Sequence, residues 1–220
     1  MNDNCIYKGM CDIECTSRCM KYLEMNYLLE TSNIPKSKRK INTLIPDSID
    51  VKAFEKLADI RDNIVDFVQQ GTSLYIFSDR VGNGKTTWAI KLMLQYFNEV
   101  WAGNGFTPRG IFVNVPTFLT MNKNIISLPD KNFEIMRDQL PYVDLVIFDD
   151  IASTKLSDYD YNMLLTYIDQ RVVSEKATIY TGNIVPEHLK DFVGSRLKSR
   201  ICGKKNVNGM QVMLKGSDKR

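Results

Sequence analysis

Residues 78–87 read SDRVGNGKTT, which differs from the phosphate-loop pattern GxxxxGK[ST] only in an Asp at the position of the first Gly. An apolar run, SLYIFS (residues 73–78), precedes the stretch, and a helical pattern, TTWAIKLMLQYFNEVWAG (residues 86–103), follows it. Strand, loop and helix in this order are the context that a phosphate-binding loop requires. The stretch therefore predicts an α/β fold and a nucleotide site together.

Backbone N–H groups of such a loop converge on phosphates, and the following helix N-terminus adds partial positive charge. We expect Lys85 to reach the β- and γ-phosphates of ATP and Thr86 to offer its hydroxyl to Mg²⁺. Asp79 occupies the outermost position, where a side chain can point away from the phosphates. The predicted nucleotide-binding residues of the loop are Gly82, Asn83, Gly84, Lys85, Thr86 and Thr87. Taken alone, GNGKTT could also be a plain glycine turn before a helix.

The composition is that of an ordinary globular protein: 220 residues, 44% hydrophobic and 25% charged. This excludes disordered, collagen-like and coiled-coil chains and allows one sizeable core with a small appendage. There is no run of about 18 apolar residues and no signal-peptide pattern in MNDNCIYKGM, so we expect a cytoplasmic protein without a membrane segment. The net charge of +3 neither requires nor excludes a nucleic-acid partner.

Apolar, β-branched runs alternate with helical patterns along the rest of the chain. Runs typical of strands buried on both faces lie at residues 110–115, 145–150 and 177–183, with a short one from 209. Helical patterns lie at residues 51–70, 116–126, 131–140 and 157–175. Alternating elements of this kind predict a doubly wound α/β domain with a parallel sheet.

Two carboxylates end the apolar run VDLVIFDD, at Asp149 and Asp150. A Mg²⁺ site on such a sheet needs an acid at the carboxyl end of a strand beside the phosphate loop. Asp149 fits that role, and Asp150 could orient and deprotonate the attacking water. Paired acids at a strand end can also simply meet a turn, but their place after the phosphate loop favours the Mg²⁺ site.

The last two motifs of the chain each contain polar candidate site residues. Asn183 closes the run ATIYTGN, where a neutral amide can hydrogen-bond the γ-phosphate or the lytic water. In VGSRLKSRI, Arg196 and Arg200 are four residues apart and share a helical face. An arginine presented to a neighbouring subunit's nucleotide would stabilise transition-state charge. A solvated basic helix is the other interpretation.

Four of the five cysteines, Cys5, Cys11, Cys15 and Cys19, crowd into the first 19 residues with the spacing Cx5Cx3Cx3C. In a reducing compartment such clustering indicates metal before disulfide. Four thiolates make a complete tetrahedral set for structural Zn²⁺. The spacing is not a standard finger pattern, so an iron–sulfur cluster and buried free thiols stay open as alternatives.

The order of these motifs resembles that of the AAA+ ATPases, and among them the DnaC/DnaI-like replicative helicase loaders of bacteria and their phages. The likeness covers roughly residues 30–220 and rests on VGNGKTT, DLVIFDDI, SDYDYNMLLTYIDQR, ATIYTGN and GSRLKSRI. GNGKTT and FDD are generic to P-loop NTPases. The TGN strand, the SRLKSRI helix and the ending LKGSDKR are more discriminating.

The resemblance implies a P-loop domain without the usual helical lid. It makes Asn183 the sensor 1 residue and Arg200 the arginine finger, with Arg196 as the alternative. Ser157 and Tyr159 fall where such loaders contact single-stranded DNA. Stacking of a tyrosine ring on bases makes physical sense, although a tyrosine packed on a helix face is nearly as good an interpretation.

Two departures from the family pattern bear on the rate of hydrolysis. Asp150 replaces the Glu more common at the catalytic-base position, which shortens the side chain by one methylene. Asp79 replaces the first Gly of the loop. Both fit a slow switch better than a fast motor, and a loader needs few turnovers per event.

These features predict three parts: a helicase-contacting, Cys-rich segment at 1–30, a linker at 31–50 and the AAA+ ATPase domain at 51–220. The predicted function is ATP-dependent loading of a hexameric DnaB-type replicative helicase onto single-stranded DNA by a homo-oligomer. A transposition helper ATPase and a non-hydrolysing ATP-binding adaptor are the alternatives. A metabolic nucleotide kinase is a weaker one, because no acceptor-binding lid sequence is evident.

Overall fold

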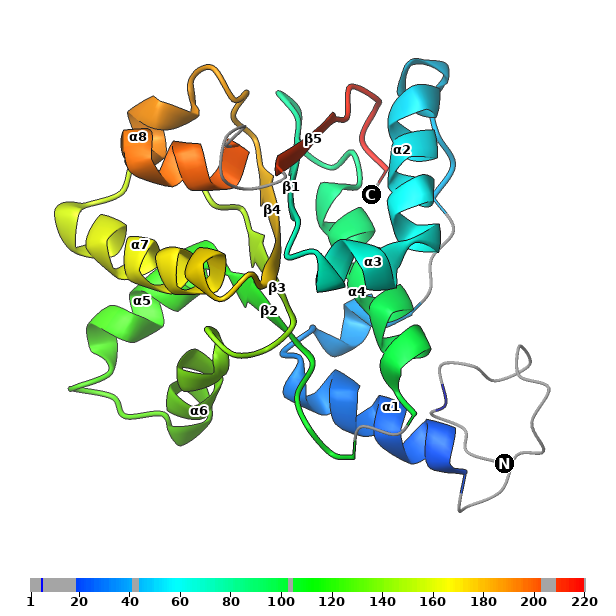
Figure 1. Ribbon diagram of the computed structural model, residues 1–220. Coiled ribbons are helices and arrows are strands. Elements are labelled where there is room, and N and C mark those ends of the chain that lie inside the picture. The colour runs from blue at the N-terminus through cyan, green and yellow to red at the C-terminus, as the bar shows by residue number, and fades with distance from the viewer. Residues whose placement is uncertain (1–4, 6–18, 41–43, 103–104, 203–208, 220) are drawn as a thin grey trace.

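A parallel sheet of five strands, in the order β2-β3-β4-β1-β5, forms the centre of the computed structural model (Figure 1). The structure describes residues 5, 19–40, 44–102, 105–202 and 209–219. All four neighbouring strand pairs are parallel, as the buried apolar runs predict. The strands are β1 (Ser73–Phe77), β2 (Gly110–Asn114), β3 (Leu145–Asp149), β4 (Ala177–Gly182) and β5 (Gly209–Met213).

Helices cover both faces of this sheet, and each strand buries alternate residues on opposite faces (Figure 1). In β1, for example, Leu74 and Ile76 join one core cluster while Tyr75 and Phe77 join the other. The first cluster is covered by α1 (Met20–Thr31), α2 (Val51–Asp62), α3 (Ile64–Gln69) and α4 (Lys85–Val100). The second is covered by α5 (Val115–Asn124), α6 (Lys131–Gln139), α7 (Asp158–Val173) and α8 (Leu189–Cys202). The predicted doubly wound α/β fold is confirmed.

The helical pattern at residues 51–70 forms two helices rather than one. The break lies at Asn63, whose backbone has φ −114° and ψ 32°. Its backbone N–H and its side-chain amide both donate to the carbonyl of Asp59, at 3.1 and 2.9 Å. Such local side-chain bonds compete with the helical ladder. The apolar face continues across the break because Ile60 and Ile64 are both buried.

β2 is the strand at one edge of the sheet, and residues just after α1 cover its outer side. The carbonyl of Ser32 accepts from the N–H of Phe112 at 2.7 Å, and Asn33 Nδ2 donates to the carbonyl of Phe112 at 3.1 Å. Ile34 is only 1% exposed and belongs to the same cluster as α4. Pairing of this kind satisfies an edge strand that would otherwise template aggregation. The first residues of the predicted linker therefore pack on the sheet, along with the short 3-10 turns η1 (Lys36–Lys38) and η2 (Ser48–Asp50) further on.

Arg171 of α7 is fully buried and ties together the amino-terminal ends of β3 and β4. Its guanidinium donates to the carbonyls of Leu140, Val143, Asp144 and Ala177 at 2.6, 2.9, 3.3 and 2.5 Å, and to Thr178 Oγ1 at 3.0 Å. Burial lowers the pKa of Arg171 to about 9, which still leaves it charged at neutral pH. The bonds offset the cost of burying this charge, because each donor has an acceptor.

Arg171→Lys is expected to destabilise the protein by about 2–4 kcal/mol, because an ammonium cannot reach this planar set of acceptors and leaves buried carbonyls unpaired. Urea denaturation of the two proteins measures the difference. The matched control is Arg61→Lys, at a partly exposed arginine paired with its neighbour Asp62, for which less than about 1 kcal/mol is expected. Equal effects of the two substitutions would show that the Arg171 bonds contribute nothing particular.

Candidate nucleotide site

The loop between β1 and α4 has the backbone conformation that its glycines permit. Gly82 and Gly84 have φ values of 77° and 96°, in the left-handed region. The side chain of Asn83 is fully buried, and its Nδ2 donates to Ser78 Oγ at 2.5 Å and to the carbonyl of Leu214 at 3.0 Å. Asn83 thus fixes the loop from inside the protein, and any contact it makes with a phosphate must come from its backbone.

Lys85 lies at the start of α4, is 8% exposed, and bends back across the loop. Its ammonium donates to the carbonyl of Arg80 at 2.9 Å and to Asn83 Oδ1 at 3.2 Å. Asp79, the residue that departs from the loop pattern, is exposed. The charge of Lys85 is therefore held over the loop by neutral acceptors, which anionic phosphate oxygens can replace favourably.

Asp149, at the carboxyl end of β3, joins the loop to the neighbouring strand. Its Oδ1 accepts from Thr86 Oγ1 and from Thr181 Oγ1, both at 2.7 Å. Thr181 lies in β4 and is 2% exposed. Thr181 is not among the site residues predicted from the sequence, although a polar residue near the end of an apolar strand was a usable signal.

Asp150 begins the turn after β3 with a φ of 62°, which directs the chain sharply away from the sheet. Its N–H donates to Thr181 Oγ1 at 3.0 Å, and its Oδ1 accepts from Asn183 Nδ2 at 3.4 Å. Burial raises the pKa of Asp150, the charge of Asp149 raises it further, and Lys85 opposes both. A carboxylate whose pKa is raised in this way is suited to accept a proton.

The side-chain oxygen of Asn183 is a hydrogen-bond acceptor that follows β4, beside Asp149 and Asp150. Its Oδ1 is buried and, within the described part of the chain, has no hydrogen-bond partner. A buried amide oxygen of this kind calls for a donor, and a water molecule would supply one. The side chains of Asp150 and Asn183 therefore meet at one place, as the predicted roles require.

The oxygens gathered here fit Mg²⁺, which prefers carboxylate, hydroxyl and phosphate oxygens. Thr86 and Asp149 are already joined by a 2.7 Å hydrogen bond, so both can face one cation. When bound, Mg²⁺ would neutralise charge on the phosphates. The hydroxyl of Thr181 fixes the orientation of the Asp149 carboxylate.

Several solved structures share this architecture. The DnaC helicase loader matches with a TM-score of 0.62 and 17% identity, over 78% of this chain and 94% of that chain. DnaI matches with a TM-score of 0.64 and 15% identity, over 86% and 95% of the two chains. The replication initiator DnaA bound to AMPPCP and single-stranded DNA matches at 0.60 and 19% identity, over 79% of this chain but 49% of that one. No protein-family model and no curated protein sequence matches the chain.

The chain has the AAA+ fold. At identities of 15–19% these matches show the fold and the resemblance to helicase loaders and DnaA, while the chemistry rests on the residues above. The phosphate loop, Asp149 and Asn183 lie at the carboxyl ends of β1, β3 and β4, where open α/β sheets bind ligands.

The two candidate finger arginines of the AAA+ domain are held on α8 by one partner. Arg196 Nη2 and Arg200 Nε donate to the two carboxylate oxygens of Asp169, on α7, at 2.6 and 2.8 Å. Helix α8 is kinked at Gly194, whose φ is 76°. The predicted shared face of Arg196 and Arg200 is confirmed. The bonds to Asp169 fix their direction within the subunit.

Ser157 and Tyr159, predicted to contact nucleic acid, begin α7. Ser157 caps the helix: its Oγ accepts from the N–H of Asp160 at 3.3 Å and donates to Asp160 Oδ2 at 2.6 Å. Tyr159 is 56% exposed, and its hydroxyl accepts from Asn122 Nδ2 at 2.9 Å. Tyr159 is thus held at the surface with its ring accessible, while Ser157 has a structural role as well.

The predicted cysteine module lies mostly outside the described residues. Cys11 and Cys15 fall in the undescribed part, whereas Cys5 and Cys19 are partly exposed free thiols. Among the residues that the structure describes, no group of three or more His, Cys, Asp or Glu could hold a metal. Zn²⁺ binding therefore stays a prediction. Cys202 is buried, as expected, and burial raises its pKa to about 11.

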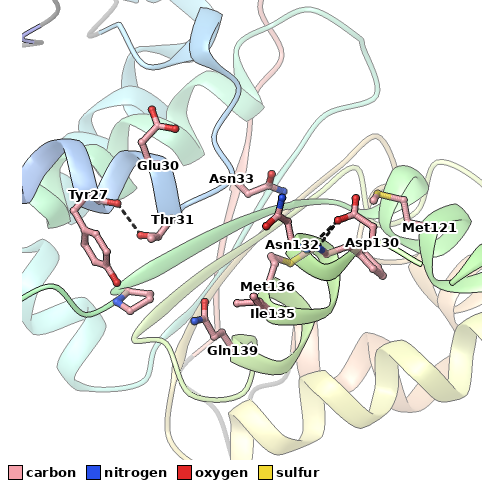
Figure 2. A pocket seen from close by; sticks show the side chains of 12 residues that line it. Tyr27, Glu30, Thr31, Asn33, Met121, Asp130, Asn132, Ile135, Met136 and Gln139 are labelled. Carbon is pink, nitrogen blue, oxygen red and sulfur yellow. Dashed lines mark hydrogen bonds between the residues drawn. The ribbon is translucent and has the colours of Figure 1, made fainter. Parts of the chain in front are cut away.

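Two cavities differ in their relation to the nucleotide site. One of about 460 Å³ adjoins the loop and is lined by Asp79 and Arg80, by Asp47 and Ile49, and by residues after β5. The other, of about 610 Å³, lies between α1, α5 and α6, with Tyr27, Asn33 and Met136 in its walls (Figure 2). The second cavity contains none of the predicted site residues.

In the described part of the chain, no helix is long and apolar enough to cross a membrane.

We expect kcat/KM for ATP hydrolysis to rise with pH as Asp150 loses its proton, with a midpoint above the 3.8 of an ordinary aspartate. Asp150→Asn should slow hydrolysis by about 10²–10⁴-fold and leave ATP binding intact. Steady-state phosphate release and titration with a fluorescent ATP analogue measure the two effects. Asp79→Asn, which removes an exposed acid of the same loop, is the control. Hydrolysis unchanged in Asp150→Asn would remove Asp150 from the base role.

Proposed function

We propose that this chain is a small AAA+ ATPase that couples ATP binding and slow hydrolysis to the loading of a hexameric replicative helicase onto single-stranded DNA. The observation that carries the proposal is the cluster at the carboxyl ends of β1, β3 and β4. There Thr86 and Thr181 share Asp149 Oδ1, and Asn183 contacts Asp150. Helicase loaders with the same fold, DnaC and DnaI, support the biological setting.

Each residue of the cluster has a role in this proposal. Lys85 exchanges its neutral acceptors for phosphate oxygens, and Thr86 and Asp149 hold Mg²⁺. Asp150 accepts a proton from the attacking water, which the free acceptor of Asn183 helps to orient. We expect hydrolysis to be slow because the side chain of Asp150 is one methylene shorter than the Glu more common at this position.

The site is completed between subunits. Arg200, with Arg196 beside it, points from α8 under the control of Asp169 and would reach the nucleotide of the next subunit in a homo-oligomer. An arginine finger of this kind contributes about 10³–10⁵ in rate. Oligomerisation on the helicase would thereby switch hydrolysis on.

The partner surfaces follow the predicted parts of the chain. We assign helicase contact to residues 1–30, where Zn²⁺ held by the cysteines would supply folding energy. Elemental analysis of the purified chain tests the metal. Single-stranded DNA would contact Ser157 and Tyr159, the latter through its ring, because Tyr159 is 56% exposed. DnaA, with the same fold, has been seen bound to single-stranded DNA.

Loading of a purified bacterial replicative helicase onto circular single-stranded DNA is expected to require this protein and ATP. Lys85→Ala should abolish it through loss of ATP binding. Tyr159→Ala should weaken DNA binding by about 1–3 kcal/mol per stacked base and leave ATP binding intact. Co-elution of helicase with circular DNA measures loading, and fluorescence anisotropy measures DNA binding.

Failure to bind or load the helicase, with or without ATP, would contradict the loader function. Preference for duplex DNA and a transposase in the same assays would favour a transposition helper. Binding of ATP and helicase without any turnover would favour a non-hydrolysing adaptor.

Mixing two inactive variants tests the shared site. Lys85→Ala removes the phosphate contact and keeps the arginine, whereas Arg200→Ala does the reverse. An oligomer of both contains interfaces in which Lys85 and Arg200 are intact, so ATPase activity should reappear on mixing. Lys85→Ala mixed with Lys85→Ala,Arg200→Ala is the control without rescue. Lack of rescue in helicase-bound mixtures would contradict a finger in trans.

A further inference from the structure

A short segment after β5, residues Lys215–Lys219, lies against the phosphate loop, and we call it the strap. The N–H of Lys219 donates to the carbonyl of Gly82 at 2.9 Å. Just before the strap, Leu214 donates its N–H to the carbonyl of Phe77 at 2.9 Å and accepts from Asn83 Nδ2 at 3.0 Å. The chain after β5 therefore contacts the end of β1 at Phe77 and the phosphate loop at Gly82 and Asn83.

The side chain of Asp218 packs directly on the loop glycine. A methyl group at Gly82 would lie 2.1 Å from Asp218 Oδ1, far inside van der Waals contact. Gly82 is thus needed for its φ of 77° and also for the approach of the strap. The strap holds the loop through the carbonyl of Gly82, which accepts from the N–H of Lys219.

Two carboxylates just before α2 anchor the strap. Asp50 is 1% exposed, and its two oxygens accept from the N–H groups of Lys215 and Gly216 at 2.7 and 2.9 Å. Asp47 accepts from the N–H of Ser217 at 2.5 Å and from the Lys219 ammonium at 2.9 Å. Hydrogen bonds to ionised carboxylates are about twice as strong as neutral ones. The anchoring is therefore strong relative to the few residues involved.

Ionisation of Asp47 supports this arrangement at neutral pH. The N–H of Ser217 lowers the pKa of Asp47 most, followed by the bonds from Lys219 and the Ser217 hydroxyl, to about 2. A lowered folded-state pKa stabilises the anchor above the ordinary value of 3.8, and this stabilisation is lost as pH falls toward 2. The Asp47 carboxylate is therefore charged at neutral pH, where ATP binding would be measured.

We propose that Asp47 and Asp50 are positioning residues for ATP binding: through the strap they hold the phosphate loop in the shape that receives the nucleotide. The inference rests on the proposed nucleotide site. Preorganisation of this kind lowers the ordering cost of binding. It also links the loop to the segment that precedes α2. In the sequence, that segment lies between the loop and residues 1–30, to which we assign the helicase contact.

Asp50→Asn is the sharpest test, because an amide nitrogen would face an N–H group in place of an acceptor oxygen. The dissociation constant of a fluorescent ATP analogue is expected to rise by roughly tenfold or more. In ATPase assays KM for ATP should rise, with kcat at saturating ATP retained, since the reacting groups are untouched. A general loss of structure would lower kcat as well. Hydrogen exchange at residues 215–219 reports release of the strap.

Two further variants keep the test decisive. Asp47→Asn acts at a partly exposed anchor and should weaken ATP binding in the same direction, even if the buried Asp50 variant does not fold. Asp62→Asn makes the same charge change on α2, where the carboxylate pairs with Arg61, and should leave ATP affinity unchanged.

The outcomes separate this inference from the proposed function. Released strap with unchanged ATP affinity in the Asp47 and Asp50 variants overturns the positioning role alone. Wild-type protein that binds no ATP overturns both. Wild-type protein that binds ATP normally, and loses affinity in these variants, but loads no helicase, supports the positioning role and overturns the loader function.

Discussion

One carboxylate oxygen organises the candidate site. Asp149 Oδ1 accepts hydrogen bonds from Thr86, at the start of α4, and from Thr181, near the end of β4. Three segments that are distant in the sequence are thereby fixed together at the carboxyl ends of the strands. Asp150 follows Asp149 directly and Asn183 lies two residues after Thr181, so the hydrogen bond between Asp149 and Thr181 helps to set the separation of Asp150 and Asn183. Any displacement of β3 relative to β4 would alter the positions of Asp149, Asp150 and Asn183 together.

At the amino-terminal ends of β3 and β4, a second interaction holds the two strands together. The buried guanidinium of Arg171 binds carbonyls that precede β3 and residues that begin β4, so the two strands are tied at both ends. A charge buried this deeply is tolerated only because its donors are satisfied.

The strap adds a third constraint, on the loop rather than on the strands. It takes the carbonyl of Gly82, and carboxylates near α2 hold it in turn. The predicted phosphate loop is thus supported by two segments that are distant in the sequence, one before α2 and one after β5. In this arrangement a movement of the segment before α2 would shift the predicted phosphate loop. By the reciprocity of coupled equilibria, a ligand that binds the loop would also affect that segment.

Local patterns in the sequence determined the strands, the phosphate loop, the acids after β3 and the doubly wound order, because period, glycine placement and strand ends are properties of neighbouring residues. They also placed Arg196 and Arg200 on one helical face. They did not reveal the break at Asn63, Thr181 as a partner of Asp149, Asp169 as the common partner of both arginines, or the strap on Asp47 and Asp50. Each of these depends on side chains brought together from distant segments, or on a local bond that overrides a periodic pattern. Only the tertiary structure decides which of many available polar groups become neighbours, because hydrogen bonds form at about 3 Å and sequence spacing does not specify that distance.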